Sequence, residues 1–143
     1  MERLWTKSFI LMIIGMLFLF TSFYMLYPTL PLFIKEKGGS ESQIGLAMGA
    51  FMLSSVIVRP FVGGLLDRFG RRPFIIWGLL SFAVAMYMYN WIGGIVVLMA
   101  LRIMHGMTWA VSTTAILTAV TDLIPSTRRG EGMGWSGMAM TLA

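Results

Sequence analysis

The chain has 143 residues, of which 57% are hydrophobic and 12% are charged, and its mean hydropathy is +0.80. A soluble domain carries about 25% charged residues because it must cover its surface with polar groups, so this composition excludes an ordinary soluble protein. The net charge of +5 comes from basic residues scattered among apolar runs, which excludes a nucleic-acid-binding domain, and the lack of cysteine excludes disulfide scaffolds and thiolate zinc sites. The composition therefore indicates a membrane protein whose first partner is the lipid bilayer.

The first predicted membrane helix covers residues 8–34. The 20 residues from Ser8 to Tyr27 are uncharged, which is enough to cross a hydrocarbon core of about 30 Å at about 1.5 Å per residue. Pro28 and Pro31 follow, so we expect a kink or a frayed end there. A cleaved signal peptide is the alternative for residues 1–27, but no small-residue cleavage site precedes Pro28.

Three further membrane helices are predicted at residues 43–66, 74–90 and 94–120. The second of the four is uncharged except for Arg59, which Pro60 follows, and it ends at a charged loop over residues 67–73. The third and fourth are separated because the turn signal Asn90-Trp91-Ile92-Gly93-Gly94 interrupts a long uncharged stretch. A last helix is expected from about residue 131, but the 12 residues after Glu131 reach only about 18 Å and do not span a bilayer.

The positions of the lysines and arginines predict the orientation of these helices. Cytoplasmic loops carry an excess of both residues. With a cytoplasmic N-terminus, the outer loops hold only Lys35 and Lys37, whereas the inner segments hold Arg3, Lys7, Arg68, Arg71, Arg72, Arg128 and Arg129. We therefore expect a multi-pass protein of the plasma membrane with its N-terminus in the cytoplasm.

The loop after the second predicted helix carries the most specific motif of the chain. It reads Gly63-Gly64-Leu65-Leu66-Asp67-Arg68-Phe69-Gly70-Arg71-Arg72. Gly63 would permit a close approach of helices, and Gly70 would permit the positive φ of a tight turn. Asp67 and Arg71 are four residues apart, so they can pair if the helix continues for another turn. The alternative interpretation is a charged turn that serves only to set the orientation of the chain.

This segment resembles the G-x-L-x-D-R-x-G-R-R signature of the major facilitator superfamily of transporters, which lies in the loop between helices two and three of that family. The resemblance implies an all-α membrane fold, with four transmembrane helices and the start of a fifth. Residues 1–143 would form part of the family's N-terminal bundle of six helices. The signature would then lie on the cytoplasmic side of the membrane, as the predicted orientation places it.

The same resemblance implies a conformational latch on the cytoplasmic side. In the family the acidic residue of the loop faces the other half of the transporter, and its arginine pairs with an acid that closes helix four, where Asp122 stands in this chain. The latch would hold the outward-facing state. The alternative is a set of charges in headgroup water, where an exposed pair contributes about 0 to 1 kcal/mol. The latch residues would be Gly63, Asp67, Arg68, Gly70, Arg71, Arg72 and Asp122.

Three polar residues inside the predicted helices are candidates for proton coupling or for the substrate pathway. Arg102 lies about eight residues into the fourth helix, where a charge costs at least about 2.5 kcal/mol unless it faces the bundle interior or a wet pathway. Its surroundings also resemble the family pattern whose arginine is associated with proton coupling in some members. His105 could relay a proton or could be a buried packing residue. Arg59 could take part in the pathway, although snorkelling to the interface is the favoured interpretation.

No pattern in the sequence indicates an enzyme. Residues 132–137 spell the dinucleotide-binding fingerprint G-x-G-x-x-G, but no strand is predicted before them. We expect instead that these glycines, like Gly45 and Gly49, form small-residue faces where helices approach closely. No metal-ligand cluster, phosphate loop or carboxylate pair stands out in the sequence, so we expect no catalytic residue, no metal and no cofactor.

The expected function is transmembrane transport of a small solute by alternating access, as part of a proton-coupled efflux transporter. Such transporters have about twelve helices, so this chain by itself is expected to be truncated, to lack the C-terminal half and to be inactive. One alternative is a complete small four-helix transporter that acts as a homodimer, but the membrane-embedded glutamate of such proteins is missing from residues 8–27. The other alternative is a membrane interaction subunit without transport activity.

Overall fold

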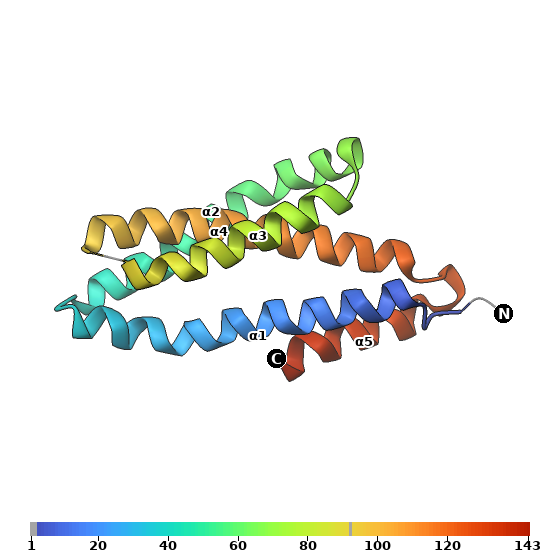
Figure 1. The fold of residues 1–143 in the computed structure, drawn as a ribbon, viewed down its shortest axis with the longest axis horizontal. Coiled ribbons are helices and arrows are strands. Elements are labelled where there is room, and N and C mark those ends of the chain that lie inside the picture. The colour runs from blue at the N-terminus through green and yellow to red at the C-terminus, as the bar shows by residue number, and fades with distance from the viewer. Residues whose placement is uncertain (1–2, 92) are drawn as a thin grey trace. The chain divides into compact units, whose positions relative to one another are not determined.

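The structure is a computed structural model that describes residues 3–91 and 93–143. Helices account for nearly all of these residues, and no strand occurs among them. In chain order the elements are α1 (Lys7–Glu36), α2 (Glu41–Phe69), α3 (Arg72–Met88), the 3-10 turn η1 (Tyr89–Trp91), α4 (Ile95–Leu123), the 3-10 turn η2 (Ser126–Arg128) and α5 (Arg129–Leu142). The α-helices are labelled in Figure 1. The expected all-α class is confirmed.

Four of the helices are long and apolar enough to cross a membrane. They are α1, α2, α4 and α3 continued through η1 to Trp91. The first three have 29 or 30 residues each, more than the roughly 20 that a hydrocarbon core requires, so they either extend beyond it or tilt within it. The fifth helix has 14 residues and is too short to span.

Three prolines lie inside these helices without ending them, so the frayed end expected after Pro28 and Pro31 does not occur before Glu36. Pro28 and Pro31 lie inside α1, and Pro60 lies inside α2. Each proline removes only its own N–H donor. The helix can therefore continue, because the residues on both sides keep their hydrogen bonds. Pro73 occupies the first turn of α3, where a missing N–H leaves no hydrogen bond unmade. Ile92, the centre of the predicted turn at residues 90–94, lies outside the described residues.

The start of α2 is fixed by a reciprocal cap. The Ser40 hydroxyl accepts from the backbone N–H of Gln43 at 3.3 Å, and the Gln43 side chain accepts from the backbone N–H of Ser40 at 2.8 Å. The preceding turn contains Gly38 with a φ of 80°, which is the left-handed conformation that glycine adopts without strain. Together these residues set the short connection between α1 and α2.

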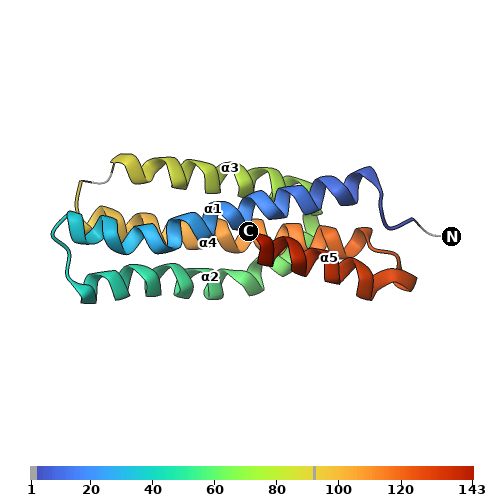
Figure 2. The ribbon, with the colours of Figure 1, turned by 90° about the horizontal axis from the view of Figure 1, so that it is seen from below.

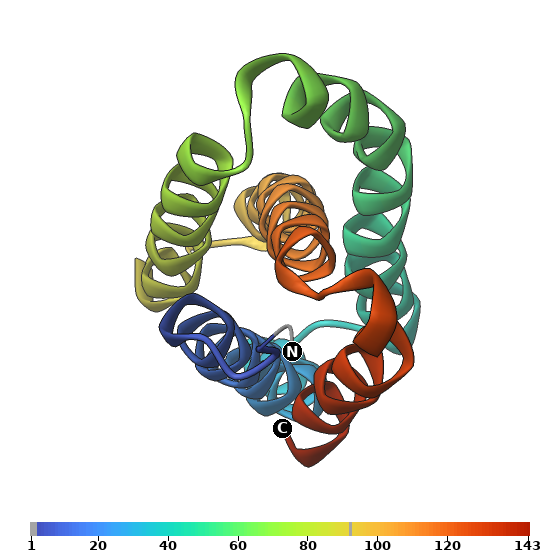
Figure 3. The ribbon, with the colours of Figure 1, turned by 90° about the vertical axis from the view of Figure 1, so that its right-hand side faces the viewer.

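The described chain divides into two compact units, one of residues 27–115 and one of residues 1–26 with 116–143. In the 27–115 unit, α4 lies between α2 and α3, as Figures 2 and 3 both show. Near the end of α2, Val62 and Leu66 form a buried apolar cluster with Ala115 of α4, and Phe74 and Ile75 of α3 pack against it. This cluster lies beside the loop that carries the sequence motif.

Two glycines allow the close packing around α4. A methyl group on Gly106 would overlap the Phe51 carbonyl oxygen and the Ser54 hydroxyl of α2. On the other side, a methyl group on Gly78 of α3 would lie 2.9 Å from the Ser112 hydroxyl of α4. Helix backbones approach this closely only where the side chain is absent or very small.

In the other unit, aromatic rings join the N-terminal segment to α5. The Trp5 and Trp135 rings meet edge to face with centroids 5.0 Å apart, a favourable geometry for aromatic pairs. A methyl group on Gly132 of α5 would lie 2.6 Å from the Ile124 side chain. Gly132 therefore has the small-residue role expected of residues 132–137, whereas a methyl group on Gly134 or Gly137 would meet no atom of the described residues within 4 Å beyond the local helix backbone.

Candidate functional site

The loop motif begins where α2 ends, at a turn that depends on Gly70. Gly70 has a φ of 86°, so the positive φ expected from the sequence is present. Its backbone N–H donates to the Leu66 carbonyl at 2.9 Å, and the Arg71 guanidinium donates to the same carbonyl at 3.1 Å. The orphan carbonyls that end a helix need such donors, so Gly70 and Arg71 together close α2.

Arg71 also pairs with Asp67, although α2 does not continue past Phe69. One guanidinium nitrogen of Arg71 lies 3.3 Å from a carboxylate oxygen of Asp67. The further helical turn expected from the sequence is not needed for this pairing, because the chain reverses after Phe69 and the arginine folds back over the turn. The Asp67 side chain is 78% exposed, so the pair by itself adds little stability.

The other motif residues differ in what they contact. The Arg68 guanidinium lies over the ring of Phe69, 5.2 Å from its centroid, and Arg72 is the exposed first residue of α3. Gly63 does not have the close-packing role that the sequence suggested, because a methyl group there would meet no atom of the described chain within 4 Å. The same is true of Gly45 and Gly49. The close approaches of α2 and α3 to α4 occur at other glycines, Gly106 and Gly78.

Asp122 is the last but one residue of α4 and is exposed. It belongs to the unit of residues 1–26 and 116–143, whereas Asp67 and Arg71 belong to the unit of residues 27–115. Its pairing with Arg71 stays a prediction.

Arg102 is buried at the centre of the 27–115 unit, with 2% of its surface exposed. Its Nε donates to the Ala47 carbonyl of α2 at 3.1 Å, and one terminal nitrogen donates to the Tyr89 hydroxyl at 3.3 Å. The other terminal nitrogen lies 3.6 Å from the Met48 sulfur, and the guanidinium lies 4.4 Å from the centroid of the Phe51 ring. A buried charge is tolerated when it is hydrogen-bonded in this way. Arg102 therefore faces the interior of this unit.

His105 lies one turn further along α4 and is fully buried. Its Nδ1 lies 3.0 Å from the Tyr89 hydroxyl oxygen, and its Nε2 has no hydrogen-bond partner in the described part of the chain. The rings of Phe51, Phe82 and Tyr89 surround it, with centroids 4.7 to 5.5 Å from that of the imidazole. The structure thus joins two residues singled out from the sequence, Arg102 and His105, through a third that sequence reasoning missed.

Arg59 turns toward α4. One of its terminal nitrogens donates to the Thr114 hydroxyl at 3.4 Å, and its side chain is half-buried. The sequence favoured an Arg59 side chain that snorkels to the membrane interface. That interpretation does not account for a hydrogen bond between α2 and α4. In the described chain, Arg59 is linked to α4 by its hydrogen bond to Thr114. No hydrogen bond among the described residues links Arg59 to the group formed by Arg102, Tyr89 and His105.

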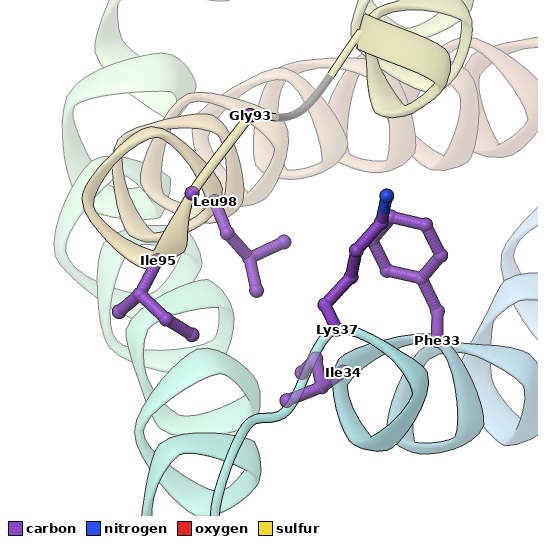
Figure 4. Close-up of a pocket in the computed structure, with 7 residues that line it drawn as sticks. Phe33, Ile34, Lys37, Gly93, Ile95 and Leu98 are labelled. Carbon is purple, nitrogen blue, oxygen red and sulfur yellow. The ribbon is translucent and has the colours of Figure 1, made fainter.

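A pocket of about 140 Å³ opens between the end of α1 and the start of α4 (Figure 4). Its lining is mostly apolar, and its one charged side chain, Lys37, lies over the Phe33 ring at 5.8 Å from the centroid. Among the described residues, no group of three metal-ligating side chains occurs here or elsewhere. The lining offers apolar contacts and a single cation, and no set of reactive groups. The lining residues are Phe33, Ile34, Lys37, Gly93, Gly94, Ile95 and Leu98.

Comparisons with known proteins agree on one family. The family model of the Major Facilitator Superfamily matches residues 12–143. The quinolone resistance protein NorA of Staphylococcus aureus is 29% identical over 129 residues, which cover 90% of this chain and 33% of that protein. Multidrug resistance protein 2 of Bacillus subtilis is 29% identical over 133 residues, which cover 93% of this chain and 33% of that protein. The chain thus spans about a third of the length of these curated relatives.

Proposed function

The chain belongs to the Major Facilitator Superfamily, and from this membership we propose that it forms the N-terminal helices of a secondary transporter. The transporter moves a small solute across the plasma membrane by alternating access. The protein is a multi-pass membrane protein and not an enzyme. Its N-terminus and the loop from Gly63 to Arg72 lie on the cytoplasmic side in this proposal, which the distribution of lysine and arginine supports.

The proposed direction of transport is efflux. One relative is named for resistance to quinolones and another for resistance to multiple drugs, and quinolones are small organic compounds. We extend that chemistry to this chain and propose a small organic solute as the substrate, exchanged for protons.

The observation that carries the proton-coupling part is the burial of Arg102. A permanent positive charge at membrane depth is costly and is kept where it serves a pathway or a switch. Arg102 has hydrogen bonds to two other elements, α2 and η1. A change in the charge of a group near Arg102 would therefore alter the contacts between α4 and these two elements. This geometry supports a role in coupling for Arg102 and makes its neighbour His105 a candidate for the same role.

The proposed latch consists of the Asp67–Arg71 turn with Asp122. Support comes from the ion pair of Asp67 with Arg71 and from the position of Asp122 at the end of α4. The exposed Asp67 carboxylate has room to contact a helix end elsewhere in a full transporter. Breaking the latch would then release the outward-facing state.

We also propose that transport requires helices beyond those of this chain. The relatives are about three times as long as the matched segment, and substrates of such transporters bind between two halves. The two alternative functions, a four-helix homodimeric transporter and a subunit without transport activity, gain no support from the family match.

A chimera tests the transport proposal. Residues 12–143 replace the matching segment of the Staphylococcus aureus relative, and the chimera and the chain alone are reconstituted separately in liposomes. We expect proton-driven quinolone transport by the chimera and none by the chain alone. Arg102→Ala should abolish the proton-driven flux of the chimera, whereas Arg129→Ala, which changes an exposed arginine, should preserve it. Proton-driven flux by the chain alone would overturn the need for further helices.

A further inference from the structure

The Tyr89 hydroxyl lies between the two buried polar groups of α4. It is 3.3 Å from a terminal nitrogen of Arg102 and 3.0 Å from Nδ1 of His105. Tyr89 comes from η1, directly after α3, while the other two residues are one turn apart on α4. One oxygen atom therefore connects two elements and two polar side chains inside the 27–115 unit.

The donors and acceptors at this oxygen can be assigned from their chemistry. A guanidinium only donates hydrogen bonds, so the Tyr89 oxygen must accept from Arg102. The hydroxyl keeps one proton of its own, and Nδ1 of His105 is the acceptor within its reach. In this assignment Nδ1 carries a lone pair, and a neutral imidazole then carries its proton on Nε2.

The opposite assignment leaves more groups unsatisfied. If Nδ1 carried the proton and donated to Tyr89, the Tyr89 proton would have no acceptor among the described residues, and the Nε2 lone pair would have no donor. With the proton on Nε2, a single one of these groups, the Nε2–H, is without a partner among the described residues. Buried polar groups are nearly always hydrogen-bonded, so the assignment with fewer unsatisfied groups is the stable one.

The remaining Nε2–H is a buried donor in apolar surroundings. Phe51 and Phe82 flank the imidazole, and the His105 side chain is fully buried. An unsatisfied buried donor of this kind needs an explanation, and an acceptor atom that arrives during function supplies one. A solute oxygen or a water molecule has the required chemistry.

We propose that Tyr89 is a positioning residue that holds His105 in the neutral Nε2–H tautomer and thereby presents one buried hydrogen-bond donor to an acceptor atom from the solute or from water. The solute part rests on the proposed transport function. The tautomer rests only on the contacts within this chain.

The tautomer can be measured directly because His105 is the only histidine of the chain. The full chain is labelled with ¹⁵N-histidine, placed in lipid nanodiscs at neutral to mildly alkaline pH and studied by NMR, in which protonated and lone-pair imidazole nitrogens resonate far apart. We expect a lone pair on Nδ1 and a proton on Nε2. A predominant Nδ1–H tautomer or a charged imidazolium in the unmodified chain would overturn the proposal, without any variant having to fold.

Two tyrosine variants test the positioning role. Tyr89→Phe removes the hydroxyl and should turn the single tautomer into a mixture. Tyr87→Phe is the matched control, because Tyr87 lies two residues earlier with 63% of its surface exposed, and it should leave the His105 signals unchanged. A single Nε2–H tautomer in Tyr89→Phe would show that Tyr89 does not set it.

The source of the acceptor is tested in the same samples and in the chimera, which supplies the second half that substrate binding is proposed to require. Magnetisation transfer from water to the Nε2–H would identify water as the acceptor, and a shift of the Nε2 signal on adding the quinolone ciprofloxacin would identify the solute. If neither occurs, the donor role is wrong. These outcomes are independent of flux: an Nε2–H tautomer together with an inactive chimera would refute the transport proposal and leave the assignment of Tyr89 intact.

Discussion

Arg102 owes its stability in the core to the shape of its side chain. The planar guanidinium reaches a backbone carbonyl with Nε and a hydroxyl with a terminal nitrogen, while its central carbon lies over the Phe51 ring. These contacts point in different directions, and a rigid fork of five donors can satisfy them together. A lysine ammonium is a single point with three donors and lacks a flat face for stacking.

This geometry predicts that Arg102→Lys destabilises the chain more than Arg102→Met. The lysine keeps a buried charge and loses partners, which should cost about 1 to 3 kcal/mol. The methionine removes the charge together with its desolvation penalty, so its loss should be smaller. The free energies of unfolding are compared in detergent micelles, with Arg68→Lys and Arg68→Met as exposed controls that should stay within about 0.5 kcal/mol of the parent. Greater tolerance of lysine than of methionine at position 102 would contradict the prediction.

At Asp67, stability and function should respond differently. Because its side chain is 78% exposed, Asp67→Lys should change the free energy of unfolding by no more than about 1 kcal/mol. In the chimera the same change should abolish transport if the turn is part of the latch. Glu41→Lys is the control, because Glu41 also forms an exposed ion pair, with Lys35 at 3.7 Å, and its transport should persist. Unchanged flux in Asp67→Lys would remove the latch role from this loop.

At the scale of elements, the packing of α4 depends on where a glycine faces a neighbouring helix. Gly106→Ala should destabilise the chain by about 1 to 3 kcal/mol, because the added methyl group overlaps the Phe51 carbonyl and the Ser54 hydroxyl. Gly64→Ala on α2 is the matched control, because its methyl group meets no described atom within 4 Å beyond the local helix backbone, and the higher helix propensity of alanine should keep stability equal or raise it. Thermal unfolding of both variants checks the difference, and equal loss in the two would refute it.

The sequence predicted the elements well and their contacts only in part. Long uncharged runs bounded by charged loops are enough to predict four membrane helices, because hydropathy depends on composition alone. The contacts of a glycine depend on how helices cross, so nothing in the sequence distinguished Gly106 from Gly63. The depth of Arg102 predicted that it faces the interior, but its partner Tyr89 could not be chosen among the tyrosines because η1 brings it to α4 only in the folded chain.

At the scale of the whole molecule, the orientation in the membrane can be tested cleanly because the chain has no cysteine. Single cysteines at Lys37, between α1 and α2, and at Ser126, between α4 and α5, should lie on opposite sides of the membrane. In intact cells a membrane-impermeant maleimide should label Lys37→Cys and spare Ser126→Cys until the membrane is opened. The reversed labelling pattern would place the N-terminus outside and the loop motif with it.

Pro60 gives α2 a local weakness that the rest of the helix lacks. Because proline has no N–H to donate, the Val56 carbonyl lacks its usual hydrogen bond from the residue four positions later. Even so, α2 continues to Phe69. Helices kink most readily at such a position. The segment after Pro60 carries Asp67 and lacks this one backbone tie to the rest of α2, so its position depends on the packing of Val62 and Leu66 against Ala115 of α4.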